Sequence, residues 1–385
     1  MEPITHLLTG ACIGRAGLNR KTAFATLAAV LAAEAADLDV LWAFAGPVNE
    51  LKHHRGFTHT FLGAPVVAGV VVGAVWIGHF WLERRRIRQT AAGGQAAGII
   101  ASGPSVTGPL PVSRGRQPVR WGWLYAAALI AALSHVLLDW TNNYGVRPFF
   151  PFNSRWYAGS FVFIVDPVIW AILFLALLMP WILGLADREI GARRKPFRGR
   201  GWAIFALAGM AALGGLRWWQ HGQAISLAHG NAVTSAHIER LAAEPYPINP
   251  FRWHVIVETP DFYQTAEVNT WDSSVDTDPQ TDLIYKPIRT PAVEAAMQTF
   301  LGRVYLDWGT WAVVRDMGQQ PVAGLDPPQL PPDRTWTTVR FSDLRFRYSF
   351  IASRSNSDAS SLSGLVYIID GRENGGEVMN GRVQK

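Results

Sequence analysis

Histidine and aspartate residues are grouped in three short segments of the first 140 residues, with spacings that suit a metal site. The segments are Asp37-Leu38-Asp39, His53-His54-Arg55-Gly56-Phe57-Thr58-His59 and Ser134-His135-Val136-Leu137-Leu138-Asp139. In the third segment the four-residue spacing puts the imidazole and the carboxylate on one face of a helix. His6 and Asp166 are two further candidates. Imidazole nitrogens and carboxylate oxygens are ligands of divalent metals, and so many histidines favour zinc, as one or two ions.

Eight side chains are more than one metal ion needs. Catalytic zinc typically takes three protein ligands, so the other side chains are expected to bind a second ion, to orient the ligands or to act as a general base. The predicted metal ligands are His6, Asp37, Asp39, His54, His59, His135 and Asp139. The predicted catalytic residues are Asp39, Arg55 and Asp166. The alternative for the whole set is a group of interhelical hydrogen bonds or a proton relay.

The Asp-x-Asp pair raises a geometric question. On an ideal α-helix Asp37 and Asp39 are separated by about 200°, so they cannot both face one ion. Either Asp37 lies on the face of Glu34 while Asp39 points elsewhere, or the helix is broken at this point.

The elements that carry these residues are predicted from the distribution of charge. The chain has 385 residues, of which 17% are charged and 49% hydrophobic, whereas a soluble domain has about 25% charged residues. The first 220 residues account for the shortfall, because they contain five apolar stretches long enough to cross a bilayer. These are residues 22–45, 61–82, 121–139, 161–185 and 202–219. A shorter segment, 4–14, is expected to be a half-helix or re-entrant segment, and an ordinary cytosolic enzyme is excluded.

The positions of Lys and Arg predict the orientation of these spans. Sixteen basic residues lie in three segments that alternate with the loops 46–60 and 140–160, which contain only four. Because short cytoplasmic loops are enriched in Lys and Arg, both loops and everything after about residue 220 are expected outside the cytoplasm. This topology places the histidines and aspartates at one depth, roughly 10 Å below the outer surface. The orientation is predicted from Lys and Arg alone, without the positions of the histidines and aspartates. That it nevertheless places these residues at one depth is the main argument for a common site.

The predicted fold is therefore a polytopic α-helical membrane domain, residues 1–220, followed by a soluble α+β domain, residues 221–385, outside the cytoplasm. Residues 89–119 are rich in Gly, Ala, Ser and Pro and are predicted to be a flexible cytoplasmic linker. In the second domain we expect strands at 253–257, 303–308 and 337–341 and helices near 232–243 and 291–301.

Several chemistries are excluded by the residues that the chain lacks. The single cysteine, Cys12, rules out an intramolecular disulfide and a cysteine-based zinc finger. The motifs H-E-x-x-H, G-x-S-x-G and G-x-x-x-x-G-K-[ST] are absent from the sequence. Zincin proteases, α/β-hydrolases and P-loop ATPases are therefore unsupported.

The ordered set of segments resembles a known family. Thr5-His6, Asp37-Leu38-Asp39, the His54-to-His59 element and the Ser134-to-Asp139 element together are similar to the YdjM-like membrane-bound metal-dependent hydrolases, over about residues 1–185. The combination of H-R-G-x-T-H with S-H-x-x-x-D is fairly specific, while Asp-x-Asp alone is weak. Family members often have Pro where this chain has Ala36, so the helix break is expected to differ. The resemblance implies a bacterial inner-membrane location and hydrolysis at a metal.

Two functions from different classes follow. The first is a metal-dependent hydrolase at the outer face of the membrane that acts on a lipid or cell-envelope phosphoester, with Arg55 either stabilising an anionic transition state or pairing with lipid headgroups. The alternative is a non-enzymatic metal-ion or proton transporter, or a scaffold whose exported domain binds envelope partners. The inner halves of the spans contain few polar residues, which favours a site open to one side. The expected partners are the lipid bilayer and a lipid or envelope substrate, with no nucleic acid.

Overall fold

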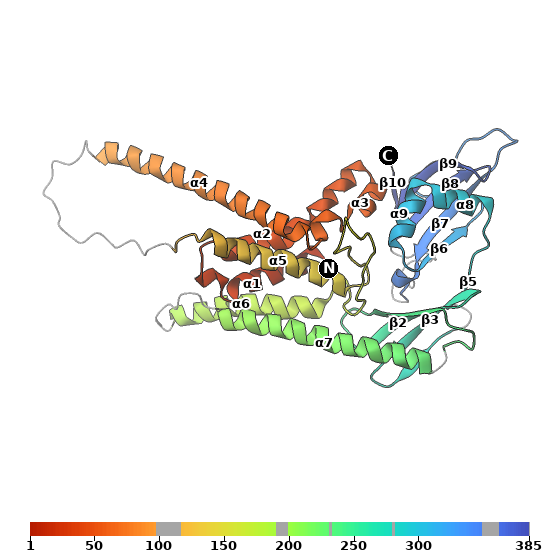
Figure 1. Ribbon diagram of the computed structural model, residues 1–385, viewed down its shortest axis with the longest axis horizontal. Coiled ribbons are helices and arrows are strands. Elements are labelled where there is room, and N and C mark those ends of the chain that lie inside the picture. Colours follow the sequence, from red (N-terminus) through yellow and green to blue (C-terminus); the bar gives the residue numbers. More distant parts are fainter. Residues whose placement is uncertain (98–116, 190–198, 231–232, 279–281, 349–361, 385) are drawn as a thin grey trace.

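The chain divides into a helical N-terminal half and a sheet-rich C-terminal half in the computed structural model (Figure 1). The structure describes residues 1–97, 117–189, 199–230, 233–278, 282–348 and 362–384. The helices of the first half are α1 (Pro3–Arg15), α2 (Ala25–Glu34), α3 (Pro47–His53), α4 (Gly63–Ala97), α5 (Trp121–Thr141), α6 (Pro167–Glu189) and α7 (Arg200–Gly230). Three short 3-10 helices join them, namely η1 (Leu18–Arg20), η2 (Ala35–Ala45) and η3 (Phe57–His59).

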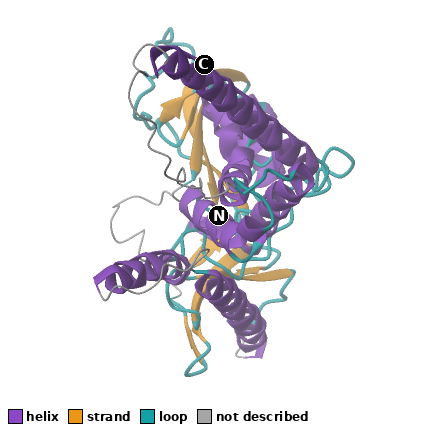
Figure 2. Cartoon of the chain, turned by 90° about the vertical axis from the view of Figure 1, so that its left-hand side faces the viewer, coloured by secondary structure: helices purple, strands orange, loops and turns teal. Residues whose placement is uncertain are grey.

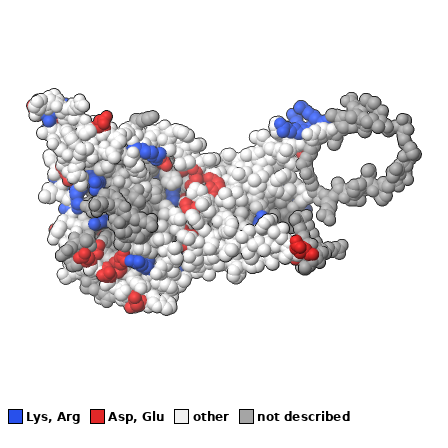
Figure 3. Space-filling model, turned by 180° about the vertical axis from the view of Figure 1, so that it is seen from behind, with Lys and Arg blue, Asp and Glu red and all other residues white. Residues whose placement is uncertain are grey.

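Four helices are long and apolar enough to cross a membrane. They contain the candidate spans Gly63–Gln89, Trp121–Thr141, Pro167–Asp187 and Arg200–Gly230. The starts of α4 and α6 and the ends of α5 and α7 lie toward the sheet-rich half (Figure 1). Charged side chains are dense on the sheet-rich half and sparse along the helical half (Figure 3). This distribution is the one expected where lipid covers the helices.

The five-span count is not confirmed, because the first expected span is split. Residues 25–34 form the α-helix α2, which at 1.5 Å per residue is about 15 Å long, half the thickness of a bilayer core. From Ala35 the chain continues as the 3-10 helix η2. The short helix α1 packs against α2, so the two form a helical hairpin beside the longer spans.

Small residues allow α1 and α2 to approach closely. A Cβ atom added at Gly10 would lie 2.7 Å from the carbonyl oxygen of Ala29, and one at Gly14 would lie 2.5 Å from Cα of Thr26. The facing side of α2 is lined by buried alanines: Ala25, Ala28, Ala29, Ala32 and Ala33. This G-x-x-x-G packing is common between membrane helices and brings the end of α2, where the aspartates follow, close to α1.

The C-terminal half contains two antiparallel sheets and two helices. The first sheet has the order β1-β2-β3-β4, with β5 also paired to β3, and the second has the order β10-β9-β8-β7-β6. Their strands are β1 (Arg240–Pro245), β2 (Arg252–Glu258), β3 (Phe262–Asn269), β4 (Ser274–Asp276), β5 (Leu283–Tyr285), β6 (Ala312–Asp316), β7 (Trp336–Asp343), β8 (Ser363–Ile369), β9 (Glu373–Met379) and β10 (Arg382–Val383). Helices α8 (Pro291–Gln298) and α9 (Phe300–Trp308) pack on the second sheet, followed after β7 by the 3-10 turn η4 (Leu344–Phe346). The strands of the two sheets form two separate groups when the chain is turned by 90° (Figure 2).

Two local predictions in this half were wrong. Residues 303–308, expected as a strand, belong to α9, where Leu301, Tyr305 and Trp308 are buried at helical spacing. The helix expected near 232–243 is absent from its described residues 233–243, where β1 begins at Arg240 and pairs with β2. Pairing in a sheet has outweighed the local preference of this segment for a helix.

The expected boundaries also differ from the helix ends. Helix α4 extends to Ala97, so residues 89–97 of the predicted linker are helical, and residues 98–116 of that linker lie outside the described residues. Helix α7 continues ten residues beyond the boundary expected at 220, to Gly230.

The two halves share hydrophobic cores. Ala224 and Ala228 at the end of α7 pack with Trp253 and Val255 of β2. On the other side of the junction, Val48 and Leu51 of α3 join a core that contains Trp308 and Leu301 of α9. The sheet-rich half is therefore held against the ends of the helices where the candidate ligands lie.

Candidate metal centre

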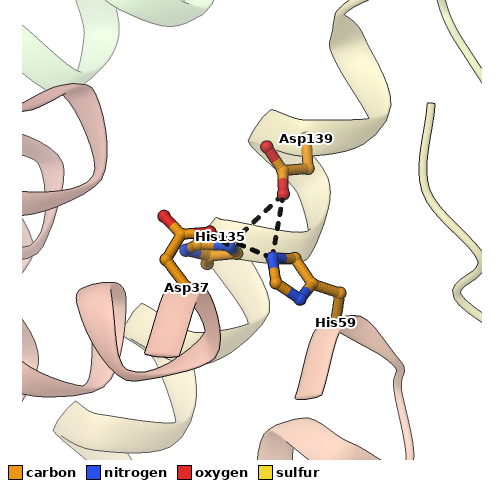
Figure 4. A group of neighbouring side chains, drawn as sticks. All are labelled: Asp37, His59, His135 and Asp139. Atoms are coloured by element: carbon orange, nitrogen blue, oxygen red, sulfur yellow. Dashed lines mark hydrogen bonds and ion pairs between the residues drawn. The ribbon is translucent and has the colours of Figure 1, made fainter. Parts of the chain in front are cut away.

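Four of the candidate ligands meet at one point. Asp37 of η2, His59 of η3 and His135 and Asp139 of α5 each contribute one ligand atom to a group whose atoms lie within 4.8 Å of one another (Figure 4). His59, His135 and Asp139 are fully buried, while the side chain of Asp37 is 18% exposed. Three segments far apart in the sequence thus supply two imidazoles and two carboxylates.

The 3-10 winding of η2 brings both aspartates to the ring of His59. With about three residues per turn, residues two positions apart are separated by about 120° on the shorter side, rather than about 160° as on an α-helix. Asp37 Oδ1 lies 3.2 Å from Nε2 of His59, and Asp39 Oδ2 lies 3.2 Å from Nδ1 of the same ring. The break at the end of α2 therefore places one carboxylate at each nitrogen of His59.

The hydrogen bonds of His135 define which of its nitrogens is free. Nδ1 lies 2.6 Å from the carbonyl oxygen of Ala33, so Nδ1 carries the proton that it donates to this oxygen. In the neutral ring Nε2 then presents a lone pair. Nε2 lies 3.3 Å from Oδ2 of Asp139 and 3.5 Å from Oδ1 of Asp37.

His59 is oriented in the same way. The hydroxyl of Thr58 donates to the carbonyl of Ala36, so its oxygen is left to accept from Nδ1 of His59, 3.1 Å away. Asp39 accepts from the same nitrogen. The lone pair of Nε2 then faces Asp37 at 3.2 Å and Asp139 at 3.4 Å.

Two imidazole lone pairs and two carboxylates thus point at one another without a proton between them. Two buried atoms of this group that face each other at 3.3 Å, Nε2 of His135 and Oδ2 of Asp139, have no hydrogen-bond partner. Buried acceptors that face acceptors are costly unless a cation lies between them. Two His nitrogens and two carboxylate oxygens are also a ligand set of zinc, and the group fits a divalent metal.

Arg55 fixes the other oxygen of Asp139. Its Nη2 lies 2.9 Å from Asp139 Oδ1, and its Nη1 donates to the carbonyl of Gly145 at 2.7 Å and to Oδ1 of Asn142 at 3.2 Å. The guanidinium lies over the ring of Tyr144, 4.7 Å from its centroid. Burial lowers the pKa of Arg55 to about 10, so it remains charged at neutral pH. The backbone of Arg55 has a left-handed conformation with φ of 55°, and its N–H donates to Asp39.

Asp39, His54 and His6 surround the four-residue group. Asp39 accepts from Arg55 N–H and lies 3.0 Å from Nδ1 of His54, whose side chain is 27% exposed. Burial lowers the pKa of His54, and the hydrogen bond and negative charge of Asp39 partly offset this shift. The ring of His6 stacks on that of His135 with centroids 3.7 Å apart, and its Nε2 lies 3.5 Å from Asp139 Oδ1. The amine of Met1 also contacts this oxygen.

Asp166 has different partners. Its Oδ2 lies 2.8 Å from Nη2 of Arg217, and its Oδ1 accepts from the N–H groups of Val168 and Ile169 at the start of α6. The carboxylate thus caps α6 and pairs with α7. It is not among the four residues of the group, and the catalytic role predicted for it stays a prediction.

Several supporting residues were not anticipated. They are Ala33, Thr58, Asn142, Tyr144 and Gly145, which orient the histidines or hold Arg55. Three of them act through a backbone carbonyl or a hydroxyl, which leaves no signal in a search for ligand types. The Asn142-to-Gly145 segment could have been noticed, because it directly follows the last turn of α5 that carries Asp139.

Comparison with known proteins agrees with this geometry. No curated protein and no solved structure matches the chain. The family model described as YdjM inner membrane protein matches residues 1–224, more than half of the chain, and includes every residue of the candidate metal centre. The chain therefore belongs to the YdjM inner membrane protein family.

Proposed function

We propose that the chain is an integral-membrane metal-dependent hydrolase that acts on an amphiphilic phosphoester at the outer face of the inner membrane. The observation that carries the proposal is the convergence of Asp37, His59, His135 and Asp139, with the free nitrogen of each histidine directed inward. Orienting hydrogen bonds on the outer ring nitrogens are typical of metal-binding histidines. We favour zinc, because magnesium prefers oxygen ligands in an octahedron with retained waters.

The chemistry that a divalent metal supplies in such a site is polarisation of the scissile ester and activation of water. His54 is the group best placed to accept a proton, because Asp39 holds its Nδ1 and its ring is partly exposed at the edge of the site. Arg55 supplies a fixed positive charge beside Asp139. This charge would stabilise a phosphoryl group that becomes more negative during the reaction.

The surroundings of the site favour an amphiphilic substrate. Asp37 and His54 form the partly exposed edge, and the neighbouring side chains Leu38 and Phe57 are 61% and 42% exposed. Phe61, two residues before the start of α4, is also exposed. Exposed apolar side chains next to the ligands would place a lipid, rather than a soluble solute, in contact with the site.

The test is hydrolysis by the purified full chain in lipid nanodiscs, with zinc or manganese and a panel of phospholipids and polyprenyl phosphates. We expect turnover that is abolished by a chelator and by Asp139→Ala. Metal content is measured in parallel, and His135→Ala is expected to lose the metal. His229→Ala is the matched control, because His229 is an exposed histidine at the end of α7.

If the metal-loaded protein cleaves no ester or amide above the Asp139→Ala background, the alternative function, a transporter or a scaffold, is favoured. The orientation is tested separately with reporter fusions after residue 225. Alkaline phosphatase is expected to be active there, and activity of a cytoplasmic reporter instead would overturn the placement of the site.

A further inference from the structure

A cavity lies at the junction of the two halves, next to the metal centre. It has a volume of about 280 Å³ and is formed by α3, the segment between α5 and α6, and α9. Helices α3 and α9 lie side by side at this junction (Figure 1). The cavity is therefore built by both halves of the chain together.

The charges around the cavity are mainly positive. Lys52, Arg147 and Arg303 line it together with one carboxylate, that of Asp307. Asp307 is already engaged, because its Oδ2 lies 3.7 Å from Nη1 of Arg147 and accepts from the indole N–H of Trp156 at 3.3 Å. Lys52 and Arg303 make no ion pair in the described part of the chain. The two exposed cations leave the cavity with an excess of positive charge.

Aromatic rings form the walls between these cations. The guanidinium of Arg147 lies 4.5 Å from the ring centroid of Trp156, and the ammonium of Lys52 lies 5.5 Å from that of Phe300. Arg147 is mostly buried and donates to the carbonyl of Lys52 at 3.0 Å. These contacts orient Arg147 and Lys52 before any ligand binds, which lowers the entropic cost of binding.

One aromatic layer separates the cavity from the metal centre. The ring of Tyr144 contacts that of Trp308, a wall of the cavity, with centroids 4.9 Å apart and the planes tilted by 42°. The ring of Tyr144 also contacts that of His54, with centroids 5.5 Å apart, and the guanidinium of Arg55. A molecule with a reacting bond at the metal centre could therefore place a second group in the cavity.

The segment next to Arg147 carries exposed aromatic side chains. Phe149 and Phe152 are 48% and 87% exposed, and Phe149 contacts Phe61 at the head of α4. Exposed aromatic side chains at the end of a span are typical of the membrane interface, where lipid headgroups lie.

We propose that this cavity binds the anionic, phosphate-bearing head group of an amphiphile, through Lys52, Arg147 and Arg303. The assignment of this amphiphile as the substrate rests on the proposed function, and binding itself does not. Lys and Arg recognise phosphate through charge-assisted hydrogen bonds, and three cations around one cavity select against a zwitterionic head group.

The test is a calorimetric titration of the full chain in nonionic detergent with excess chelator, so that no metal contributes. The probes are dioctanoyl phosphatidylglycerol, dioctanoyl phosphatidylcholine and glycerol phosphate. We expect the anionic lipid to bind about tenfold or more tightly than phosphatidylcholine. Lys52→Gln and Arg303→Gln should each weaken its binding about threefold to fivefold, the range of partly exposed charge pairs.

Two further variants make the test specific. Asp307→Asn should strengthen binding of the anionic lipid about threefold, because it removes the one negative charge and frees Arg147. Arg289→Gln is the matched control, since Arg289 is an exposed arginine of the same half that does not line the cavity, and it should leave binding unchanged.

Competition by glycerol phosphate would show that the phosphate itself is recognised. Binding of the anionic lipid but not of glycerol phosphate would show that the acyl chains are also needed. Both outcomes support the proposal. Equal binding of the two lipids, or equal losses for Arg303→Gln and Arg289→Gln, would overturn it. Because the titration contains no metal, absence of hydrolysis would not alter its outcome. A chain that hydrolyses phosphoesters but fails this test keeps the proposed function and loses the head-group site.

Discussion

Asp37 and Asp39 differ by only two positions, yet the structure gives them different expected roles in metal binding. Asp37 Oδ1 faces the free nitrogens of His59 and His135, whereas both oxygens of Asp39 are used by His54, His59 and the N–H of Arg55. We therefore expect Asp37 to be a ligand and Asp39 to orient the ligand His59. The same isosteric substitution, Asp→Asn, separates the two roles.

The expected magnitudes follow from these contacts. In Asp39→Asn the side chain keeps one acceptor oxygen and presents an amide N–H₂ to donors, so at least one of the two histidines loses its partner. Loss of such an orienting carboxylate typically weakens metal binding about tenfold to a hundredfold, or about 1.4 to 2.7 kcal/mol. Asp37→Asn removes a charged ligand itself, and we expect a loss greater than about a hundredfold.

The assay is competition for zinc between the purified chain and a chromophoric chelator, with metal stoichiometry measured on the same samples. Size-exclusion profiles of the metal-free variants control for folding. Asp39→Asn should keep its stoichiometry at high zinc, while Asp37→Asn should not. If Asp37→Asn retains tight zinc and Asp39→Asn loses it, the assignment is reversed, and equal affinities for both variants and the unmodified chain would refute a metal centre at this position.

Three further predictions concern packing, charge and pH. Gly14→Leu should destabilise the protein by about 1 to 3 kcal/mol, because α1 and α2 must separate, while Gly69→Leu, which has nothing within 4 Å of its added Cβ, should not; thermal unfolding compares them. Arg55→Met should cost about 3 to 5 kcal/mol, because it removes the guanidinium that pairs with the buried Asp139, and saturating zinc should restore part of this, whereas an equal loss with and without zinc would contradict the site. Burial raises the pKa of Glu244 to about 8 against 4.5 unfolded, so the folded state holds a proton that the unfolded state releases and stability falls as pH rises between these values. The effect of Glu244→Gln on the free energy of unfolding should therefore be more favourable at pH 8 than at pH 5, by on the order of a few kcal/mol. An equal effect of the substitution at both pH values would contradict the shift.

The sequence was sufficient for the features that depend on composition and local spacing. Long apolar stretches predicted the helices that contain Trp121–Thr141 and Pro167–Asp187, because the hydrocarbon thickness dictates their length. The i, i+4 spacing of His135 and Asp139 predicted that both share one helix face, and both belong to the four-residue group. Such inferences need only the geometry of one element.

The sequence was misleading where a distant contact decides the local structure. Residues 303–308 alternate like a strand, but α9 forms because its buried residues repeat at helical spacing against the second sheet. The segment 22–45 reads as one span, but it changes from α-helix to 3-10 helix after Glu34, within reach of α1 and η3. Local propensity is a weak prior when packing contributes more free energy than the backbone preference.

The chain's own sequence thus identified the apolar helices and the residue types that could form a site, since hydrophobic length and residue spacing can be read from the sequence alone. Only the tertiary structure decided which of them meet. It directed Asp37 to the free nitrogen of His59 and Asp39 to the opposite nitrogen, and it paired Asp166 with Arg217 instead. The physical reason is that hydrogen-bond distances of about 3 Å depend on how helices are rotated and shifted against one another. Close packing of small residues such as Gly10 and Gly14 sets these rotations, and no single segment encodes them.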